Sequence, residues 1–120
     1  MKKTLKSTIW IVVLGLFVLA GCSRLGKYGE PISEQPTTNI ESIVSNSTSY
    51  EGKTVKIEGK IFDECPSGCW FNLKGEKAVM YVTLSGFVIP QKVGRPTIVE
   101  GDLSNESGRL TIQAKGIEIR

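Results

Sequence analysis

Two cysteines and their neighbours form the segment of this 120-residue sequence whose residue types and spacing most clearly suggest chemistry. The segment reads DECPSGCW and covers residues 63–70. Pro66 and Gly68 allow the chain to reverse, which brings Cys65 and Cys69 within the roughly 4.4–6.8 Å between Cα atoms that a disulfide requires. We therefore predict a disulfide between these two cysteines, which would close a short loop.

The same two thiols leave a second interpretation open, in which they handle a soft metal or exchange electrons. As thiolates, Cys65 and Cys69 can hold Cu(I), with Asp63 and Glu64 as oxygen ligands. A structural zinc site takes four nitrogen or sulfur ligands, and this segment offers two thiols. A redox dithiol usually has Cys-x-x-Cys spacing at the start of a helix, whereas these cysteines are one residue further apart. Thiol-redox or metal handling is therefore the alternative to a structural disulfide.

Histidine is absent from the sequence. Its absence excludes serine and cysteine triads that depend on histidine, as well as ordinary histidine acid–base catalysis. The acidic residues form no paired-carboxylate motif, and no phosphate-binding loop is present. We therefore expect a protein that is not an enzyme and that needs no cofactor.

Aromatic side chains supply the candidate ligand contacts. Trp70, Phe71 and Tyr81 can stack on flat ligands, and Lys60 offers a positive charge. Adjacent residues of a strand face opposite sides, so one of Trp70 and Phe71 belongs to the core and the other is the better candidate. Acidic residues alternate with Lys60 and nearby lysines, which is typical of a mixed, solvated surface.

The N-terminus has the features of a targeting signal. Lys2, Lys3 and Lys6 precede an unbroken apolar run over residues 9–20. That run is shorter than the about 20 apolar residues of a transmembrane helix. A basic head, a short apolar run and small residues before a cleavage site are typical of a signal peptide. The sequence LAGC that ends the run, at residues 19–22, resembles a bacterial lipobox.

This resemblance implies a bacterial lipoprotein that is cleaved before Cys22, with residues 1–21 as the signal peptide. The Cys22 thiol would receive a diacylglycerol, and the new N-terminus a fatty acid such as palmitate. Two or three acyl chains give lasting membrane attachment. The alternative is an uncleaved signal anchor. In a cell with two membranes, Ser23 favours the periplasmic face of the outer membrane, by its similarity to known sorting signals.

Loss of the signal peptide changes the charge balance. The whole sequence has 15 basic and 12 acidic side chains, and residues 1–21 contain three of the basic ones and none of the acidic ones. The remaining 99 residues have a formal charge of zero and suffice for one small domain. Nucleic-acid binders usually have an excess of basic charge. We therefore expect the membrane, and not nucleic acid, as a partner.

The rest of the chain divides into a tether and a domain. Residues 22–37 are polar and contain glycine and proline, which predicts a flexible tether, with an ordered arm as the alternative. Thr38 and Glu41 fit a capping box at the start of a short helix. From Gly52 onward, alternating apolar residues and turn signals predict β-strands. The five predicted strands cover residues 54–62, 70–73, 78–84, 96–103 and 109–119.

An internal similarity favours a closed barrel. The sequence GKTVKIEGKI at residues 52–61 is similar to GRPTIVEGDL at residues 94–103. Each contains a glycine inside the strand, Gly59 and Gly101, and strongly bent barrel strands need such glycines.

These segments, together with WFNL, YVTL and the final LTIQAKGIEI, resemble the OB-fold. Gly68-Cys69-Trp70 is also similar to a Gly-Cys-Trp motif in uncharacterised, exported OB-fold families. The resemblance covers residues 38–120 and implies an all-β, five-stranded OB-fold-like barrel with a short N-terminal helix. It also implies a binding module, which we expect to contact an envelope protein or a small polar ligand.

Overall fold

The computed structural model describes residues 26–120, so the predicted signal peptide and Cys22 lie outside the described part of the chain. The elements are β1 (Gly26–Gly29), α2 (Ile40–Ser45), α3 (Ser47–Tyr50), β2 (Thr54–Glu64), β3 (Trp70–Lys74), β4 (Val79–Leu84), β5 (Pro96–Glu106) and β6 (Arg109–Ile119). All five predicted strands are present, and their observed ends lie within three residues of the predicted ones.

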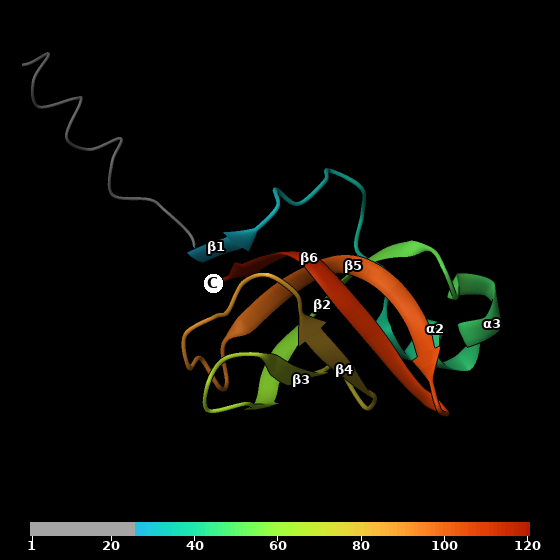
Figure 1. Cartoon of the computed structure of the whole chain (residues 1–120). Helices are drawn as coiled ribbons and strands as arrows, with labels where there is room; N and C mark the ends of the chain where they lie inside the picture. The colour runs from blue at the N-terminus through green and yellow to red at the C-terminus, as the bar shows by residue number, and fades with distance from the viewer. Residues whose placement is uncertain (1–25) are drawn as a thin grey trace, which may run out of the picture.

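Strands β2 to β6 close into a barrel (Figure 1). The order across the sheet is β1-β6-β4-β3-β2-β5, and β6 also pairs with β5, which joins the two sides. Strands β4 and β6 run parallel, while the other pairs are antiparallel. A closed barrel satisfies backbone groups that an open sheet would leave exposed at its edges. The predicted all-β barrel is confirmed.

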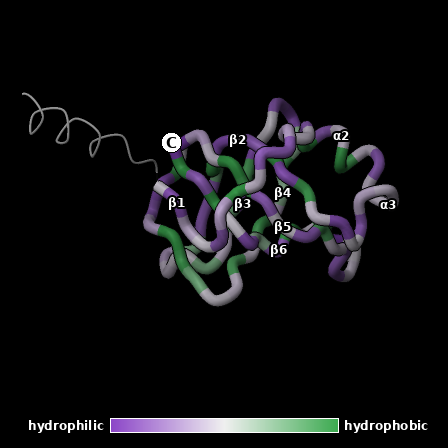
Figure 2. Tube along the Cα trace, turned by 90° about the horizontal axis from the view of Figure 1, so that it is seen from above, coloured by the Kyte–Doolittle hydropathy of each residue, from purple (hydrophilic) through white to green (hydrophobic). Residues whose placement is uncertain are grey.

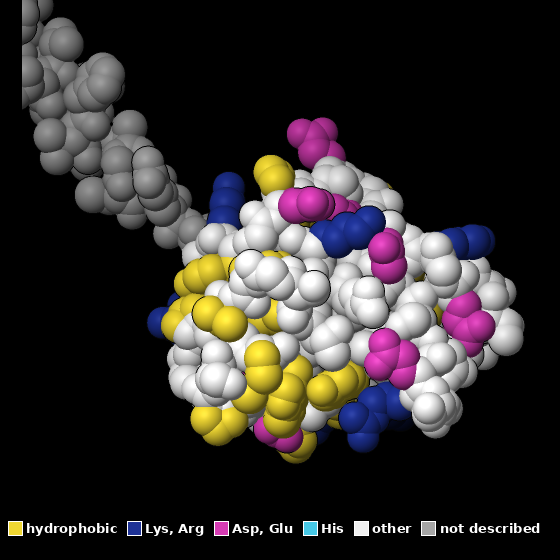
Figure 3. Space-filling model, in the orientation of Figure 1, with side chains coloured by type: hydrophobic (Ala, Val, Ile, Leu, Met, Phe, Trp, Pro, Cys, Tyr) yellow, Lys and Arg dark blue, Asp and Glu magenta, His cyan; other side chains and the backbone are white. Residues whose placement is uncertain are grey.

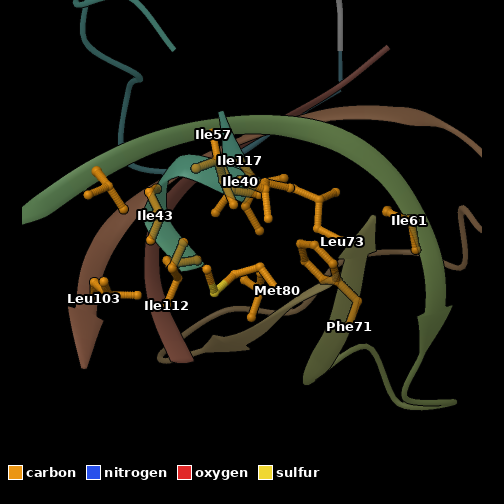
Figure 4. Packing of buried hydrophobic residues seen from close by; sticks show 14 of the residues in the cluster. Ile40, Ile43, Ile57, Ile61, Phe71, Leu73, Met80, Leu103, Ile112 and Ile117 are labelled. Carbon is orange, nitrogen blue, oxygen red and sulfur yellow. The ribbon is translucent and has the colours of Figure 1, made fainter. Parts of the chain in front are cut away.

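The hydrophobic core fills the barrel because side chains alternate between its inside and outside. This alternation is visible as changing hydropathy along the strands (Figure 2). Ile40 and Ile43 of α2 point into the same core and close one end of the barrel (Figure 4). Barrel side chains in the core include Val55, Ile57, Ile61, Phe71, Leu73, Met80, Val82, Val99, Leu103, Ile112, Ala114, Ile117 and Ile119.

Gly101 allows the tight approach of β5 to β6 at a register shift between Glu100 and Gly101. A Cβ atom at Gly101 would lie 2.2 Å from the carbonyl oxygen of Gln113 and 2.8 Å from the Cα atom of Ala114. Neither contact is sterically allowed without a shift of the backbone. The glycine predicted to bend this strand therefore also permits closure of the barrel.

The predicted capping box is wrong, because Asn39 and not Thr38 caps α2. The Asn39 side chain accepts a hydrogen bond of 2.8 Å from the backbone N–H of Glu41. The Thr38 backbone instead joins β2, donating to the Lys56 carbonyl at 2.7 Å. The Glu41 carboxylate accepts hydrogen bonds from the backbone N–H groups of Glu76, at 2.7 Å, and Lys77, in the turn between β3 and β4. Glu41 thus ties the helix to the barrel.

The flexible tether predicted for residues 22–37 is wrong for residues 26–37, which form an ordered arm on the barrel. Strand β1 pairs antiparallel with the C-terminal half of β6, from Gly26 opposite Ile119 to Gly29 opposite Gly116. This pairing covers the part of β6 that β4 does not reach. Polar composition suggested a tether, but the backbone groups of this segment find partners on the barrel.

Glu100 of β5 fixes the rest of the arm. Its carboxylate accepts hydrogen bonds from the Ser33 backbone N–H at 3.0 Å, from the Ser33 hydroxyl and from the Gln35 amide at 2.8 Å. The Lys56 ammonium lies close by and donates to the carbonyl oxygens of Ser33 and Gln35. Burial opposes ionisation of Glu100, but the hydrogen bonds from Ser33 and Gln35 and the charge of Lys56 outweigh it and lower its pKa.

Substitution of Gly101 tests the closure of the barrel. We expect Gly101→Ala to lower the free energy of unfolding by about 3 kcal/mol or more, because the backbone of β5 or β6 must shift. Gly52→Ala is the control: its φ of +78° is unfavourable for alanine, but its Cβ would meet no atom within 4 Å. That variant should cost only about 1–2 kcal/mol. Equal costs in urea unfolding would contradict the role of Gly101.

Substitution of Glu100 tests the attachment of the arm. In Glu100→Gln, an amide NH₂ replaces one accepting oxygen, so we expect amide exchange at Ser33 to rise about tenfold. Asp102→Asn is the control, since Asp102 bonds Thr54 and Lys115 and not the arm. Because the pKa of Glu100 is lowered, the attachment should persist at neutral pH and be lost as the pH falls below the ordinary value of 4.5. Unchanged exchange in Glu100→Gln would show that other contacts hold the arm.

Candidate functional site

An aromatic groove lies on the outer face of β3 and β4. Trp70 and Asn72 leave β3 on the face opposite to Phe71, and Tyr81 lies directly across from Asn72 in β4. Trp70 is therefore a diagonal neighbour of Tyr81, and their ring centroids are 5.8 Å apart with a 38° tilt between the planes. The strand pairing thus builds a partly exposed aromatic platform.

Residues from other elements form the walls of this groove. The Arg109 guanidinium carbon, at the start of β6, lies 4.9 Å from the centroid of the Tyr81 ring. Val79 of β4 and Leu110 of β6 add apolar surface, and Val44 at the end of α2 completes the rim. The groove has a volume of about 620 Å³. Its lining combines stacking surface, one cation and an amide.

The structure brings together some of the ligand contacts expected from the sequence and separates others. Trp70 and Tyr81 share the groove. Phe71 is fully buried in the core and is therefore unavailable as a ligand contact, which corrects that expectation. Lys60 lines a different hollow, of about 690 Å³, with Glu58, Lys74 and the start of α2. Lys60 is thus not part of the aromatic groove.

Sequence analysis missed Arg109 and Asn72. Asn72 belongs to the WFNL strand, and its outward direction followed from the alternation with Phe71 once the latter was placed inside. Arg109 reaches Tyr81 because β4 and β6 pair in parallel, with Tyr81 opposite Thr111. No local pattern predicts that pairing, since the two strands lie far apart in the sequence.

The two cysteines lie in the connection between β2 and β3, at the end of the barrel opposite to α2. Their Sγ atoms are 2.8 Å apart, and the Ser67 hydroxyl lies 3.0 Å from the sulfur of Cys65. Both remain thiols in this structure. Hydrogen bonds from Cys69 and then Ser67 lower the pKa of Cys65 to about 6, although burial opposes this shift.

Backbone contacts hold this loop in its tight turn. Gly68 has φ +75° and donates to the Cys65 carbonyl at 2.8 Å. A Cβ at Gly68 would lie 2.2 Å from the carbonyl oxygen of Ile89, so the connection after β4 packs directly on the loop. The Gln91 amide donates to the Cys65 carbonyl at 2.7 Å. The turn predicted from Pro66 and Gly68 is thus supported by a second loop.

The acidic residues beside the cysteines have structural partners. Glu64 is buried and accepts a hydrogen bond from the backbone N–H of Lys92, whereas Asp63 faces outward and accepts from the Asn72 amide at 3.4 Å. Within residues 26–120, no three histidine, cysteine, aspartate or glutamate side chains converge in a way that suits a metal ion. The sulfur separation of 2.8 Å is compatible with formation of a disulfide.

Oxidation of the reduced protein tests the cysteine pair. With sulfur atoms 2.8 Å apart, we expect oxidised glutathione to convert the two thiols to an internal disulfide, with loss of the mass of two hydrogen atoms and release of two reduced glutathione molecules. In Cys69→Ser, the remaining Cys65 should form no such bond. Two thiols that stay free after oxidation, or a metal removed by a chelator, would instead favour the metal or redox alternative.

Comparisons with known proteins extend the assignment of the fold. No protein-family model matches the chain, and no curated protein matches it. Among solved structures, the hypothetical protein ygiW from E. coli is similar, with a TM-score of 0.55 and 17% sequence identity. The match covers 79% of this chain and 99% of that one. At such low identity the similarity shows the fold alone, and this chain has an OB-fold-like barrel.

Proposed function

We propose that this chain is a lipid-anchored, non-enzymatic binding module of the bacterial cell envelope, and that its aromatic groove binds a small polar ligand. The observation that supports the proposal best is the cluster of Trp70, Tyr81 and Arg109 on the outer face of β3 and β4. Aromatic rings that serve only stability are usually buried, as Phe71 is here. A partly exposed aromatic pair beside a cation is typical of a binding surface.

The lining of the groove indicates the chemistry of the ligand. Trp70 and Tyr81 favour a flat, partly apolar face, since stacking on aromatic rings needs no particular hydrogen-bond pattern. Arg109 favours a carboxylate or another anion, and Asn72 can both donate and accept hydrogen bonds. A volume of about 620 Å³ falls in the range of small-molecule sites. The proposed ligand therefore combines a flat face with a carboxylate.

The envelope location rests on the lipobox at residues 19–22 and on lipidation of Cys22. Among residues 26–120, no helix is both long and apolar enough to cross a bilayer. In a cell with two membranes, Ser23 leads us to propose the periplasmic face of the outer membrane. A further proposed partner is an envelope protein that presents a flat side chain and a carboxylate to the groove.

Thiol exchange by Cys65 and Cys69 is the second candidate function. The lowered pKa of Cys65 favours it, because the thiolate is the attacking species. Burial of Cys65 disfavours it, because a reactive thiol must reach its substrate. A structural disulfide that holds the loop next to Trp70 agrees with the burial of Cys65.

Tryptophan fluorescence tests the groove directly. Once the signal peptide with Trp10 is removed, Trp70 is the only tryptophan, so its emission reports on the groove. We expect a short oligomer of a uronic acid to change this emission saturably, and a neutral cello-oligosaccharide to bind more weakly. Tyr81→Ala and Arg109→Gln should each weaken binding of the uronic acid oligomer about tenfold, from lost stacking and lost charge.

Lys60→Gln is the matched control, because it removes a surface cation outside the groove and should leave the affinity unchanged. A saturable response that survives both Tyr81→Ala and Arg109→Gln would place the ligand elsewhere. The absence of a response to either sugar would contradict the proposed ligand chemistry.

A further inference from the structure

The end of the barrel opposite to α2 and α3 gathers the start of β1, the C-terminus and the long connection between β4 and β5 (Figure 1). Gly26 lies across from Ile119 in the sheet. The Arg95 side chain donates to the carbonyl oxygen of Arg120 at 2.6 Å, and the Arg120 backbone N–H donates to Pro96 at 2.9 Å. The first described residue and the end of this connection are therefore neighbours.

The connection presents two large apolar side chains to solvent. Val88 is 60% exposed and Val93 is 58% exposed. Figure 3 shows hydrophobic side chains at the left of the molecule, beside the C-terminus of Figure 1, and further ones along its lower part, where β3 and β4 lie. Exposed apolar side chains that cluster near one another indicate a surface that contacts an apolar partner.

The backbone of this connection is well held, so these valines are not on a loose loop. Ile89 is buried and donates to the Gly68 carbonyl at 3.2 Å, and Gly94 donates to the Ile61 carbonyl at 2.7 Å. Phe87 packs against β1, where a Cβ at Gly29 would lie 2.9 Å from its ring. Val88 and Val93 therefore project from a rigid frame.

Basic residues belong to the same end of the barrel as the two valines. Lys27 of β1, Lys92 and Arg95 of the connection, and Arg120 at the C-terminus belong to this end. Two acidic residues share the same surface: Glu118 lies across from Lys27, and Glu58 pairs with Arg120 at 3.6 Å. Neither ion pair found among residues 26–120 involves Lys92 or Arg95. The Nε of Arg95 donates to the Arg120 carbonyl oxygen, so the Lys92 ammonium and the remaining N–H groups of Arg95 are the donors that can meet anionic groups.

The short distance in sequence between Cys22 and β1 limits how far this end of the barrel can lie from the membrane. Three residues separate Cys22 from Gly26. Four residue steps span at most about 14 Å, and the polar layer on each side of a bilayer core is about 5–8 Å thick. With acyl chains on Cys22, the start of β1 must therefore lie at the bilayer surface, and Val88 and Val93 are on the same end of the barrel.

We propose that Val88 and Val93 insert into the interface of the bilayer that anchors Cys22, with Lys92 and Arg95 beside lipid phosphates. The lipid surface is the occupant that the short link, the exposed valines and these two cations together favour. This contact fixes the orientation of the barrel on the membrane. The inference rests on the lipid anchor of the proposed function, and not on the ligand of the groove.

One consequence concerns access to the aromatic groove. Val44, Gly108 and Arg109, which line the groove, belong to the end with α2 and the β5–β6 turn, whereas Trp70 follows the cysteine loop near the opposite end. Membrane contact through Val88 and Val93 points this end away from the bilayer. The part of the groove at Val44, Gly108 and Arg109 would thus remain open to a ligand or a partner in the aqueous space.

Quenching by brominated lipid tests the orientation. The full lipidated chain, with Trp70→Phe to remove background emission, would carry either Val93→Trp or Val88→Trp. Each would be reconstituted into vesicles of phosphatidylethanolamine and phosphatidylglycerol, with plain or brominated acyl chains. Val79→Trp is the matched control, because Val79 is 45% exposed but lies in the groove. We expect brominated lipid to remove most of the emission of the first two variants and none of the control's.

Intact mass separates the two ways in which the proposal can fail. If the mass shows acyl chains on Cys22, but emission from positions 88 and 93 is not quenched or is quenched no more than that from position 79, the membrane contact is wrong while the anchor stands. If the mass shows no acyl chain, both the anchor and the contact are wrong. Because each valine is tested separately and both are exposed, poor folding of one variant leaves the other as a test.

Discussion

The pairing of β5 with β6 is the interaction on which the rest of the structure depends. These strands pair over nearly their whole lengths, from Thr97 opposite Ile119 to Glu106 opposite Arg109. They can do so only because Gly101 lets the two backbones approach within distances that any side chain would prevent. One edge of β6 pairs with β5, and its other edge pairs with β4 and then with β1. The aromatic groove, the arm of residues 26–37 and the end of the barrel with the β4–β5 connection each depend on the position of β6.

Closure also separates the two ends of the molecule. At one end, α2 inserts Ile40 and Ile43 into the core, and Glu41 ties the helix to the turn after β3. At the other end, the connection after β4 packs on the cysteine loop and on β1. Small barrels need segments that cover their ends, because five strands leave an apolar interior open at both ends. Helix α2 and the β4–β5 connection leave different side chains exposed, so the two ends suit different contacts.

This separation links the two proposals. A protein held by lipid through a short link has little freedom to turn, so its ligand site must lie away from the membrane to be reached. The aromatic groove is built from β3, β4, the start of β6 and α2, while the exposed valines belong to the connection beside β1. The formally neutral charge of residues 22–120 agrees with local recognition of one anionic group, since it offers no long-range attraction for a polyanion.

The sequence by itself determined the strands and the class of fold, because alternation and glycine position are local properties. It predicted the bounds of β6 as observed, and it required one of Trp70 and Phe71 to face inward. The tertiary structure decided that Phe71 faces inward, because its side of β3 is the one turned toward the interior of the closed barrel. Only the tertiary structure showed that residues 26–37 are ordered, since Ser33 meets Glu100 across 67 positions of sequence. For the same reason Arg109 joins Tyr81 only through the parallel pairing of β4 with β6. Contacts between distant residues depend on closure of the barrel, which no local pattern specifies.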